Sequence, residues 1–171
     1  MKVTDKYVFF WKEHPFCNFT KCVIKYEDET FTSSEQLFMW MKAKFFKDEK
    51  IADKILKAKT PEDARKLGRL VSNYNDSVWD ENRVGAMLQA VWSKFLQNED
   101  LRKKLCDEKY AGKKFVEAAY YDRIWGIGFD ENDALNHPES EWGRNELGQI
   151  LNKVRELLLL KSAEVYMRVD E

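Results

Sequence analysis

The stretch that decides the fold of this chain is residues 34–43, Ser34-Glu35-Gln36-Leu37-Phe38-Met39-Trp40-Met41-Lys42-Ala43. Its apolar side chains recur at the spacing of a helix, which predicts an amphipathic α-helix here. Seven residues make almost two helical turns, so the side chains of Glu35 and Lys42 point about 20° apart with about 10 Å of rise between them. We therefore expect a carboxylate and an amine on one helix face, at a separation that a small substrate can span.

The pattern around this helix predicts a small N-terminal β element followed by a helical body. Short runs rich in β-forming residues precede the helix. They are Val8–Trp11, Lys21–Tyr26 and Thr30–Thr32. We expect them to form one small sheet.

Five further helical segments and one later strand follow from apolar periodicity and capping residues. The expected helices cover Ile51–Leu56, Pro61 to about Leu70 after an N-cap at Thr60, Val78–Leu96, Glu99–Leu105 after an N-cap at Asn98, and about Asn145–Leu160; the first continues the pattern of the helix described above. Lys114–Ala118 is the expected strand, and the glycines and polar residues between 126 and 141 indicate a loop.

The composition predicts one globular domain with almost no net charge. The chain has 171 residues, of which 44% are hydrophobic and 14% aromatic, enough for one sizeable core. With 29 Lys and Arg against 30 Asp and Glu, the net charge of -1 provides no general attraction to nucleic acid or to an anionic membrane. Any nucleic-acid contact must be local, and the lysine-rich segment 42–59 is one candidate. Because we find neither a membrane-spanning apolar run nor a secretory signal, we expect a cytoplasmic protein with no membrane partner.

The cysteines and histidines give no metal-binding pattern. Cys17, Cys22 and Cys106 lie in no Cys-x-x-Cys or Cys/His cluster, so reduced thiols are the natural interpretation. His14 and His137 are the only histidines, which leaves few parts for a catalytic triad. We expect no metal requirement and assign no cofactor.

Glu35 and Lys42 each have a structural interpretation beside the chemical one. Thr32-Ser33-Ser34-Glu35 matches a capping box, in which the Thr32 oxygen accepts an amide and Glu35 reaches back to the chain. A carboxylate in the first turn of a helix can also point into a cleft and transfer a proton. Lys42 belongs to a lysine-rich run that is typical of a solvated face, but it lies between apolar neighbours that can lower its pKa and produce a neutral amine.

Two glycine-containing segments are further candidates. Residues 122–128 combine Asp122, Trp125 and two glycines, which suits a ligand-binding loop or a tight turn that buries the tryptophan. Residues 143–148 fit either a helix start capped by Asn145 or a set of amide donors for a phosphate. The sequence leaves both pairs of alternatives open.

Several separated motifs, in this order, resemble the NADAR family, also called YbiA-like. They are Pro15–Phe19, Ser34–Gln36 with Met41–Ala43, Ala64–Arg69, Asp122–Gly128 and Gly143–Gly148. The resemblance covers nearly the whole chain and implies a mainly α fold, a single compact YbiA-like helical domain with a small N-terminal β element. We expect this domain over residues 1–160 and a C-terminal tail over 161–171.

The resemblance also implies an enzyme, an N-glycosidase or ADP-ribosylglycohydrolase that cleaves a ribosyl C1–N bond. Family members are associated with ADP-ribose attached to guanine, especially in DNA, and with the phosphoribosylaminopyrimidine intermediates of riboflavin synthesis. Our leading hypothesis is removal of ADP-ribose from a guanine adduct, free or in DNA. The riboflavin-intermediate N-glycosidase and a non-catalytic ADP-ribose-binding module are the alternatives, and the partner is in each case an ADP-ribose or ribose-phosphate compound.

The residues that match the family motifs suggest how such a site works. Glu35 and Asp122 can divide the acid/base and electrostatic tasks, and Lys42 can attack C1 of an opened ribose as a Schiff-base nucleophile. We assign substrate binding to a second set of residues, with Trp125 stacking on the base. This set is Asn18, Phe19, Arg69, Trp125, Gly126, Gly128 and Asn145. The segment from 130 to 141 resembles an insertion that can act as a lid or as a selector of substrate size.

Overall fold

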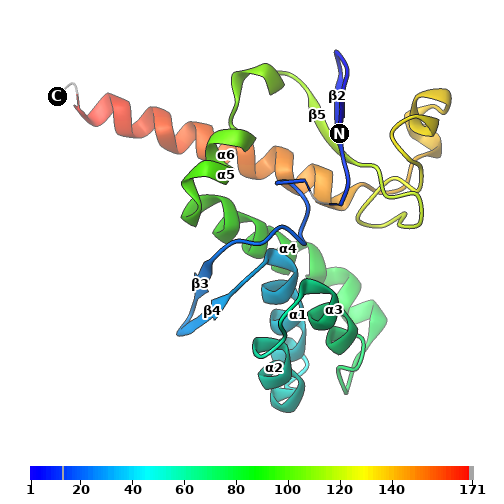
Figure 1. The fold of residues 1–171 in the computed structure, drawn as a ribbon, viewed down its shortest axis with the longest axis vertical. Helices are drawn as coiled ribbons and strands as arrows, with labels where there is room; N and C mark the ends of the chain where they lie inside the picture. The colour runs from blue at the N-terminus through cyan, green and yellow to red at the C-terminus, as the bar shows by residue number, and fades with distance from the viewer. Residues whose placement is uncertain (13, 170–171) are drawn as a thin grey trace. The chain divides into compact units, whose positions relative to one another are not determined.

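The computed structural model describes residues 1–12 and 14–169, and it separates into two compact units (Figure 1). One unit consists of residues 1–17 together with 99–171, and the other of residues 18–98. Helices form most of the described chain, which confirms the predicted mainly α fold class. The division of the chain into a domain of residues 1–160 and a tail stays a prediction.

The unit of residues 18–98 is built around one central helix that packs against three others. Its helices are α1 (Ser34–Phe45), α2 (Glu49–Leu56), α3 (Pro61–Gly68) and α4 (Asp76–Gln97). α1 contacts each of the other three, so most of its side chains are buried, including Leu37 and Trp40. A two-stranded antiparallel ribbon of β3 (Ile24–Tyr26) and β4 (Glu29–Phe31) precedes α1, and Phe31 packs on the Trp40 ring at 5.4 Å.

The starts of these helices follow local capping rules. The Thr60 side chain accepts the Asp63 N–H at 3.1 Å and Pro61 occupies the first turn of α3, as predicted. Asn75 caps α4 in the same way through the N–H of Val78. The side-chain nitrogen of Asn98 donates to Lys94 O and Val23 O, and the prediction that its side-chain oxygen caps the next helix stays a prediction.

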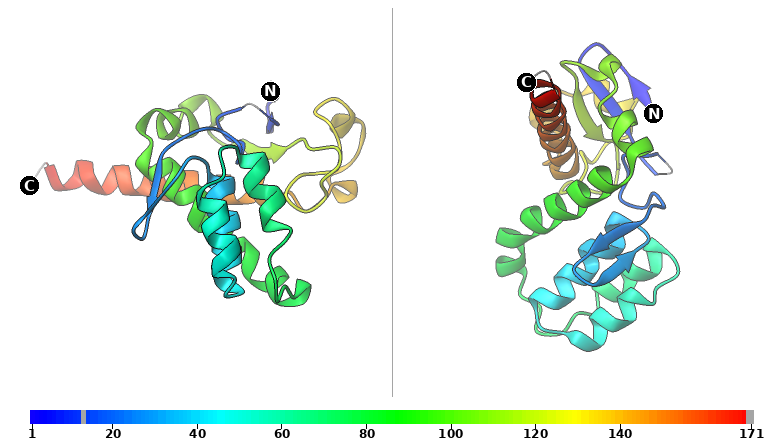
Figure 2. Two further views of the ribbon diagram at one scale, coloured as in Figure 1. Left: turned by 60° about the horizontal axis from the view of Figure 1, so that its bottom comes forward. Right: turned by 90° about the vertical axis from the view of Figure 1, so that its left-hand side faces the viewer.

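The unit of residues 1–17 and 99–171 has a small sheet with a long helix beside it (Figure 2). Its elements are β1 (Lys2–Val3), β2 (Tyr7–Phe10), α5 (Glu99–Leu105), η1 (Glu108–Tyr110), β5 (Lys114–Glu117), η2 (Asp133–Asn136), η3 (Glu139–Glu141) and α6 (Glu146–Val169). The strand order is β1-β2-β5, with β2 antiparallel to β1 and parallel to β5, and Val8 stands opposite Phe115. α6 packs along β5 and extends beyond the predicted end at Leu160 to Val169, while 170 and 171 lie outside the described residues.

The prediction of one small N-terminal sheet was wrong in its pairing. β2 pairs with β5, which follows more than a hundred residues later, whereas β3 and β4 form a separate ribbon. Strand periodicity identifies a strand but not its partner, because pairing depends on tertiary contacts. The pairing places the carboxyl ends of β2 and β5 next to each other, and the loops that leave these ends carry functional candidates.

The segment from 130 to 141 packs on this sheet. Ala134 is fully buried in a core cluster with Phe9, Val116 and Ile127. Glu139 accepts a hydrogen bond from the Tyr7 hydroxyl and forms an ion pair with Lys114, so it is tied to both β2 and β5. These contacts anchor the segment to the sheet, which disfavours its interpretation as a lid. Across the described residues, none of the helices is long and apolar enough to cross a membrane.

Candidate functional site

The helix α1 carries Glu35 and Lys42, so the prediction of a shared helix is confirmed. The capping-box interpretation of Glu35 was wrong by one residue. Ser33 is the N-cap and accepts the Gln36 N–H at 3.1 Å, while Gln36 Oε1 accepts the Thr32 N–H at 2.7 Å. The capping function therefore belongs to Ser33 and Gln36, and Glu35 is a buried carboxylate with 7% of its surface exposed.

Asn18 fixes the first turn of α1 from the preceding loop. Its backbone oxygen accepts the Glu35 N–H at 3.1 Å, and its side-chain oxygen accepts the Ser34 hydroxyl at 3.0 Å. Its side-chain nitrogen lies 3.0 Å from Met87 Sδ on α4. Asn18 is thus buried, and its polar atoms bind neighbours within its own unit, which indicates that it positions Glu35.

The Lys42 amine lies half-buried between α1, α3 and the segment before α4. Nζ donates to the Gly68 carbonyl oxygen at 2.9 Å and lies 4.2 Å from the centre of the Tyr74 ring. Burial lowers the pKa of Lys42; the negative charge of Asp76 opposes this effect, and the positive charge of Arg69 adds to it. The direction of this pKa shift agrees with the prediction for Lys42, and the carboxylate that opposes it is Asp76.

Two neighbours of Lys42 shape this environment. A Cβ on Gly68 would lie 2.1 Å from Met39 Sδ, so the absence of a side chain there allows α3 to pack closely on α1. Tyr74 donates its hydroxyl to Asp76 Oδ1 at 2.7 Å. Burial and this carboxylate raise the pKa of Tyr74 to about 12. The phenol is therefore neutral at physiological pH and presents an uncharged ring to the amine.

The other predicted ligands of this unit lie at its surface. Arg69 is exposed at the end of α3, and its charge reaches Lys42. Phe19 is half-buried, with the Arg65 guanidinium 5.9 Å from its ring centre. The exposed Arg69 guanidinium is suitable for binding a phosphate, and the partly covered Phe19 ring for packing on a sugar, so both residues remain candidates.

The loop after β5 is held by Asp122. Its Oδ1 accepts the N–H groups of Ile124 at 2.8 Å and Trp125 at 2.9 Å, while Ala119 O accepts the N–H groups of Asp122 and Gly128. One carboxylate oxygen thus maintains the loop conformation, a role that the sequence did not predict. Trp125 is half-buried, so the structure matches neither a fully buried core ring nor a fully exposed platform.

The phosphate-binding interpretation of residues 143–148 does not agree with the structure. The N–H groups of residues 143–147 donate to the carbonyls of Ile127, Arg123, Gly126, Ile124 and Trp125, respectively. These amides hold the two segments together and are not available to a phosphate. A Cβ on Gly126 would lie 2.8 Å from Glu117 O, so this close approach requires glycine.

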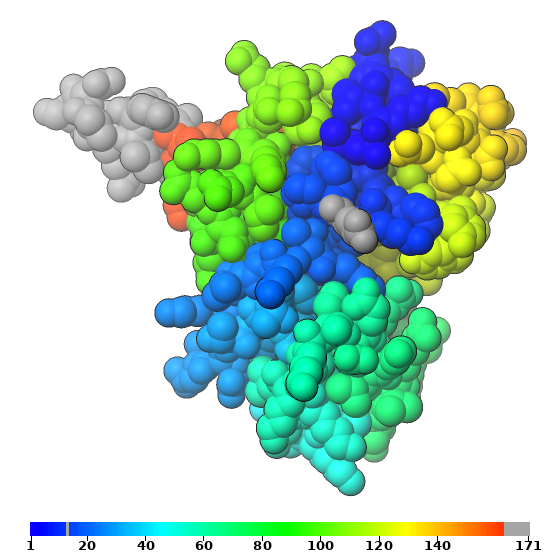
Figure 3. Space-filling view, in the orientation of Figure 1, coloured from blue at the N-terminus to red at the C-terminus, as the bar shows by residue number. Residues whose placement is uncertain are grey.

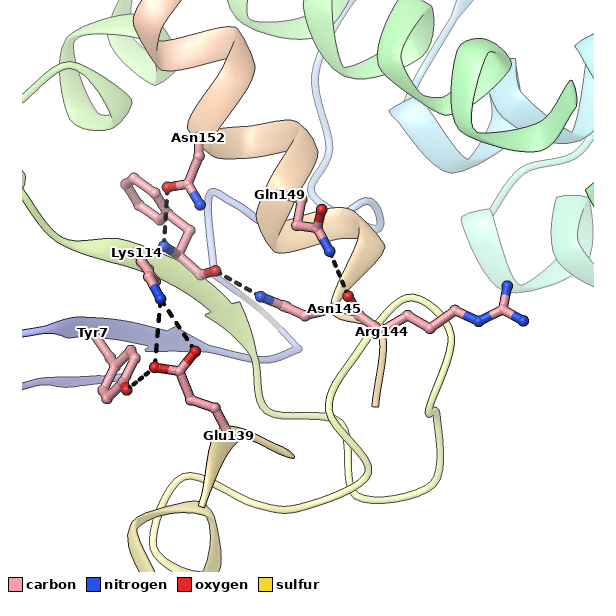
Figure 4. A network of polar contacts seen from close by, with 8 residues as sticks. Tyr7, Lys114, Glu139, Arg144, Asn145, Gln149 and Asn152 are labelled. Atoms are coloured by element: carbon pink, nitrogen blue, oxygen red, sulfur yellow. Dashed lines mark hydrogen bonds and ion pairs between the residues drawn. The ribbon is translucent and has the colours of Figure 1, made fainter. Parts of the chain in front are cut away.

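Asn145 links this loop pair to the sheet (Figure 4). Its side-chain oxygen accepts the Glu117 N–H at 3.0 Å and its nitrogen donates to Phe115 O at 2.9 Å, so the amide extends the ladder of β5. Asn152 of α6 continues this edge by accepting the Phe115 N–H at 3.1 Å. The predicted role of Asn145 in substrate binding therefore competes with a scaffold role that uses both ends of its amide.

Each unit contains its own part of the predicted set. The unit of residues 18–98 holds Asn18, Phe19, Glu35, Lys42 and Arg69, and the other holds Asp122, Trp125, Gly126, Gly128 and Asn145. The sequence did not predict Tyr74 and Asp76 as neighbours of Lys42. The Asn75 N-cap places Asp76 in the first turn of α4, but no sequence signal connects that turn with Lys42.

Comparison with known proteins identifies the family by sequence and the fold by superposition. The model of the NADAR domain family matches residues 9–159. The chain belongs to the NADAR family. The solved structure of the Escherichia coli protein YbiA superimposes with a TM-score of 0.75 at 29% identity, covering 95% of this chain and 90% of YbiA.

Relatives of this NADAR chain are named N-glycosidases. N-glycosidase R617 of Acanthamoeba polyphaga mimivirus is 37% identical over 166 residues, which cover 90% of this chain and 96% of R617. The Vibrio vulnificus riboflavin biosynthesis protein VVA0006 is 31% identical over 160 residues, 91% of this chain but 40% of that protein. These relationships place the chain among enzymes that hydrolyse N-glycosyl bonds.

Proposed function

We propose that this chain removes ADP-ribose from a guanine adduct by hydrolysing the bond between ribose C1 and the base nitrogen. The observation that carries the proposal is the Lys42 amine, whose pKa is lowered by burial and which lies on the same helix as the buried carboxylate Glu35, seven residues along the chain. A neutral amine is a nucleophile, and an adjacent acid can protonate a departing base.

The proposed reaction passes through a Schiff base. After the ribose ring opens, Lys42 Nζ forms a bond to C1 while the bond from C1 to the base nitrogen breaks, and the base leaves with a proton from Glu35. Water then adds to C1 of the imine, which releases the ribose as its aldehyde and restores the amine. In the competing route water attacks C1 directly and Lys42 only stabilises charge.

Arg69 has a subsidiary role in this proposal, whereas Asp122 and Trp125 lie in the other unit and their roles toward the substrate stay predictions. Arg69, an exposed cation at the end of α3, binds a phosphate of the substrate.

A second candidate function is hydrolysis of a phosphoribosylaminopyrimidine intermediate of riboflavin synthesis. It is favoured by the similarity to VVA0006, whose name includes riboflavin biosynthesis. The same bond is broken, so Lys42 and Glu35 keep their roles and only the substrate differs. A non-catalytic ADP-ribose-binding module is disfavoured by the N-glycosidase relatives.

Two incubations test the proposal. Purified protein is mixed with guanine-linked ADP-ribose or with the riboflavin intermediate, and the released base is quantified by chromatography. Release of the base from the guanine adduct supports the leading proposal. Release from the riboflavin intermediate alone supports the second candidate function, and release from neither compound refutes both.

Borohydride trapping during turnover tests the chemistry of Lys42. The reduced adduct is expected in the wild-type protein and absent in Lys42→Ala. Lys44→Ala is the matched control, because Lys44 lies on the same helix but is exposed and ion-paired with Glu49. An adduct that persists in Lys42→Ala would exclude this amine as the nucleophile.

A further inference from the structure

The aromatic ring of Tyr74 lies against the Lys42 amine. The centre of the ring is 4.2 Å from Nζ, within the range at which an aromatic face attracts a cation. Lys42 belongs to α1 and Tyr74 to the segment between α3 and α4, and both lie in the unit of residues 18–98. The contact therefore depends only on packing inside that unit.

Two contacts hold the Tyr74 ring in place. Its hydroxyl donates to Asp76 Oδ1 at 2.7 Å, and its ring meets that of Phe46 edge to face at 5.4 Å. Phe46 is backed in turn by Trp79, whose ring centre is 6.0 Å away. A ring that is held both at its hydroxyl and against Phe46 has little freedom to turn away from the amine.

The pair of Lys42 and Tyr74 can be reached from solvent. Tyr74 is 42% exposed, and the Lys42 side chain is half-buried. Residues 72–78 are all exposed, and Figure 3 shows the green part of the chain between α3 and α4 at the surface of this unit. A substrate that reaches the amine therefore meets this ring as well.

The proposed reaction brings positive charge to the nitrogen that the ring faces. The ring-opened substrate carries this charge on the double bond between C1 and the base nitrogen, while Lys42 Nζ starts as a neutral amine. Nζ bonds to C1, and the base leaves as a neutral molecule with a proton from Glu35. One amine proton replaces the proton that Glu35 gave, and the other stays on Nζ. The result is a protonated imine, in which Nζ and C1 share a double bond and the positive charge.

An aromatic face suits this charge better than an acidic group in contact with the amine. The ring attracts a cation through its quadrupole and takes no proton from it, so the protonated imine stays intact. A carboxylate in contact with Nζ would favour the ammonium and prevent attack. Burial and Asp76 raise the pKa of Tyr74 to about 12, so the ring is neutral at physiological pH. Arg69, Arg83 and Asp80 also act on this pair through their charges.

We propose that Tyr74 is a catalytic residue whose ring stabilises the positive charge that forms on Lys42 Nζ during the reaction. The proposal rests on the proposed function, because this charge forms only if the amine attacks C1. The hydrogen bond to Asp76 orients the ring and increases the electron density of its face. Tyr74 thus adds a group that touches the reacting nitrogen.

A series of aromatic side chains at residue 74 tests the role of the ring. Tyr74→Phe, and phenylalanines with one, two or three ring fluorines, keep the shape of the ring while its attraction for a cation falls stepwise. Release of the base from guanine-linked ADP-ribose is measured where the rate no longer depends on pH, so that Lys42 protonation does not contribute. We expect kcat to fall with each fluorine while KM stays constant. An equal kcat across the series would overturn the proposal.

Tyr74→Leu removes the ring, and Phe45→Leu is the matched control. Phe45 is 43% exposed, close to the value for Tyr74, and it packs on Phe46 and Trp79 of the same cluster. Loss of the Tyr74 ring should lower kcat about 2- to 30-fold, which corresponds to about 0.5–2 kcal/mol for a cation–π contact. The control should keep the wild-type kcat. An equal loss in both variants would mean that only the packing of the cluster matters, and it would overturn the proposal.

Imine formation with ribose 5-phosphate separates this proposal from the proposed function. The open-chain aldehyde of this sugar phosphate condenses with Nζ and loses water, and cyanoborohydride then reduces the imine by transferring hydride to C1. Mass spectrometry quantifies the adduct on the peptide that contains Lys42, with Lys42→Ala as the blank. We expect the adduct to decrease across the fluorine series, because the charged imine is the species that is reduced.

The two measurements can fail independently. A ring-dependent adduct in a protein that releases no base from either substrate would refute only the proposed function. Base release together with equal adduct in all ring variants would refute only the role of Tyr74. Absence of any adduct at Lys42 in the wild-type protein would overturn the role of Tyr74, whatever the outcome of base release.

Discussion

Replacing Asn145 with alanine should destabilise the protein rather than weaken its affinity for substrate. The change removes the bonds to Glu117 N–H and Phe115 C=O, which the structure gives at 3.0 and 2.9 Å. Each bond contributes about 1 kcal/mol net. Asn145 also has φ of 51°, where alanine costs about 1–2 kcal/mol. The free energy of unfolding should therefore fall by about 3 kcal/mol, which lowers the melting temperature by about 6–12 °C for a protein of this size.

The assay combines denaturation with hydrogen exchange. Urea denaturation gives the loss in unfolding free energy, and exchange of individual amides locates it. The Glu117 amide should lose protection, whereas the Phe115 amide donates to Asn152 at 3.1 Å and serves as an internal reference. Asn145→Gly is the matched variant, because glycine accepts positive φ and so recovers the backbone cost but not the two bonds.

The reasoning would be refuted by a variant whose stability changes by less than about 0.5 kcal/mol while KM rises strongly. That result would mean that Asn145 contacts the substrate and that its bonds to β5 matter little. An unchanged rate of exchange at the Glu117 amide would contradict the scaffold role directly, whatever the kinetics.

Three further predictions concern single residues. Asp76→Asn should move the acidic limb of the pH–rate profile to lower pH, because the Asp76 charge raises the pKa of Lys42 and attack requires the neutral amine; a limb that stays in place would contradict this. Ser33→Ala should lower the free energy of unfolding in urea by about 1 kcal/mol, because the N-cap is lost. Thr32→Ala should lower it by less, and equal losses would contradict the assignment of the N-cap to Ser33. Tyr7→Phe should destabilise the protein at neutral pH. Its carboxylate partner raises the pKa of Tyr7 from 10.0 to about 12, so the stability from the phenol is complete below pH 10 and is lost toward pH 12. Denaturation at several pH values should show wild type and variant converging in that range, and a constant difference would exclude this bond as the cause.

Local rules predicted the helices of this fold well, because the determining signals lie within a few residues. Thr60 and Pro61 specify the start of α3. The apolar stripe of α4 identified its core face only in part, because Val91 and Phe95 are buried but Val84 is exposed. The N-cap of α1 was misplaced by one residue because residues 32–34 are all hydroxyl-bearing, and only the geometry separates Ser33 from Thr32. Strand pairing between β2 and β5 could not be derived, since nothing near Tyr7 in the sequence refers to Lys114.

The same difference between local signals and tertiary packing applies to the candidate site. The shared face of Glu35 and Lys42 follows from helix geometry alone and was predictable. The influence of Asp76 on Lys42 arises from the packing of different helices, so it required coordinates. The substrate-binding role of Asn145 stays a prediction, because a motif marks a residue without distinguishing a substrate contact from the bonds to β5 that the structure shows.

The partner of the Lys42 amine explains how a lysine in this position can serve as a nucleophile. Nζ donates to the carbonyl oxygen of Gly68, which only accepts hydrogen bonds. This bond uses one N–H and leaves the lone pair of the neutral amine available, so the amine is oriented in both protonation states. A carboxylate in the same place would instead favour the ammonium and raise its pKa. The direct acceptor is an uncharged carbonyl, and Asp76 acts only through the electric field of its charge. Burial therefore remains the largest influence on the pKa of Lys42 and lowers it.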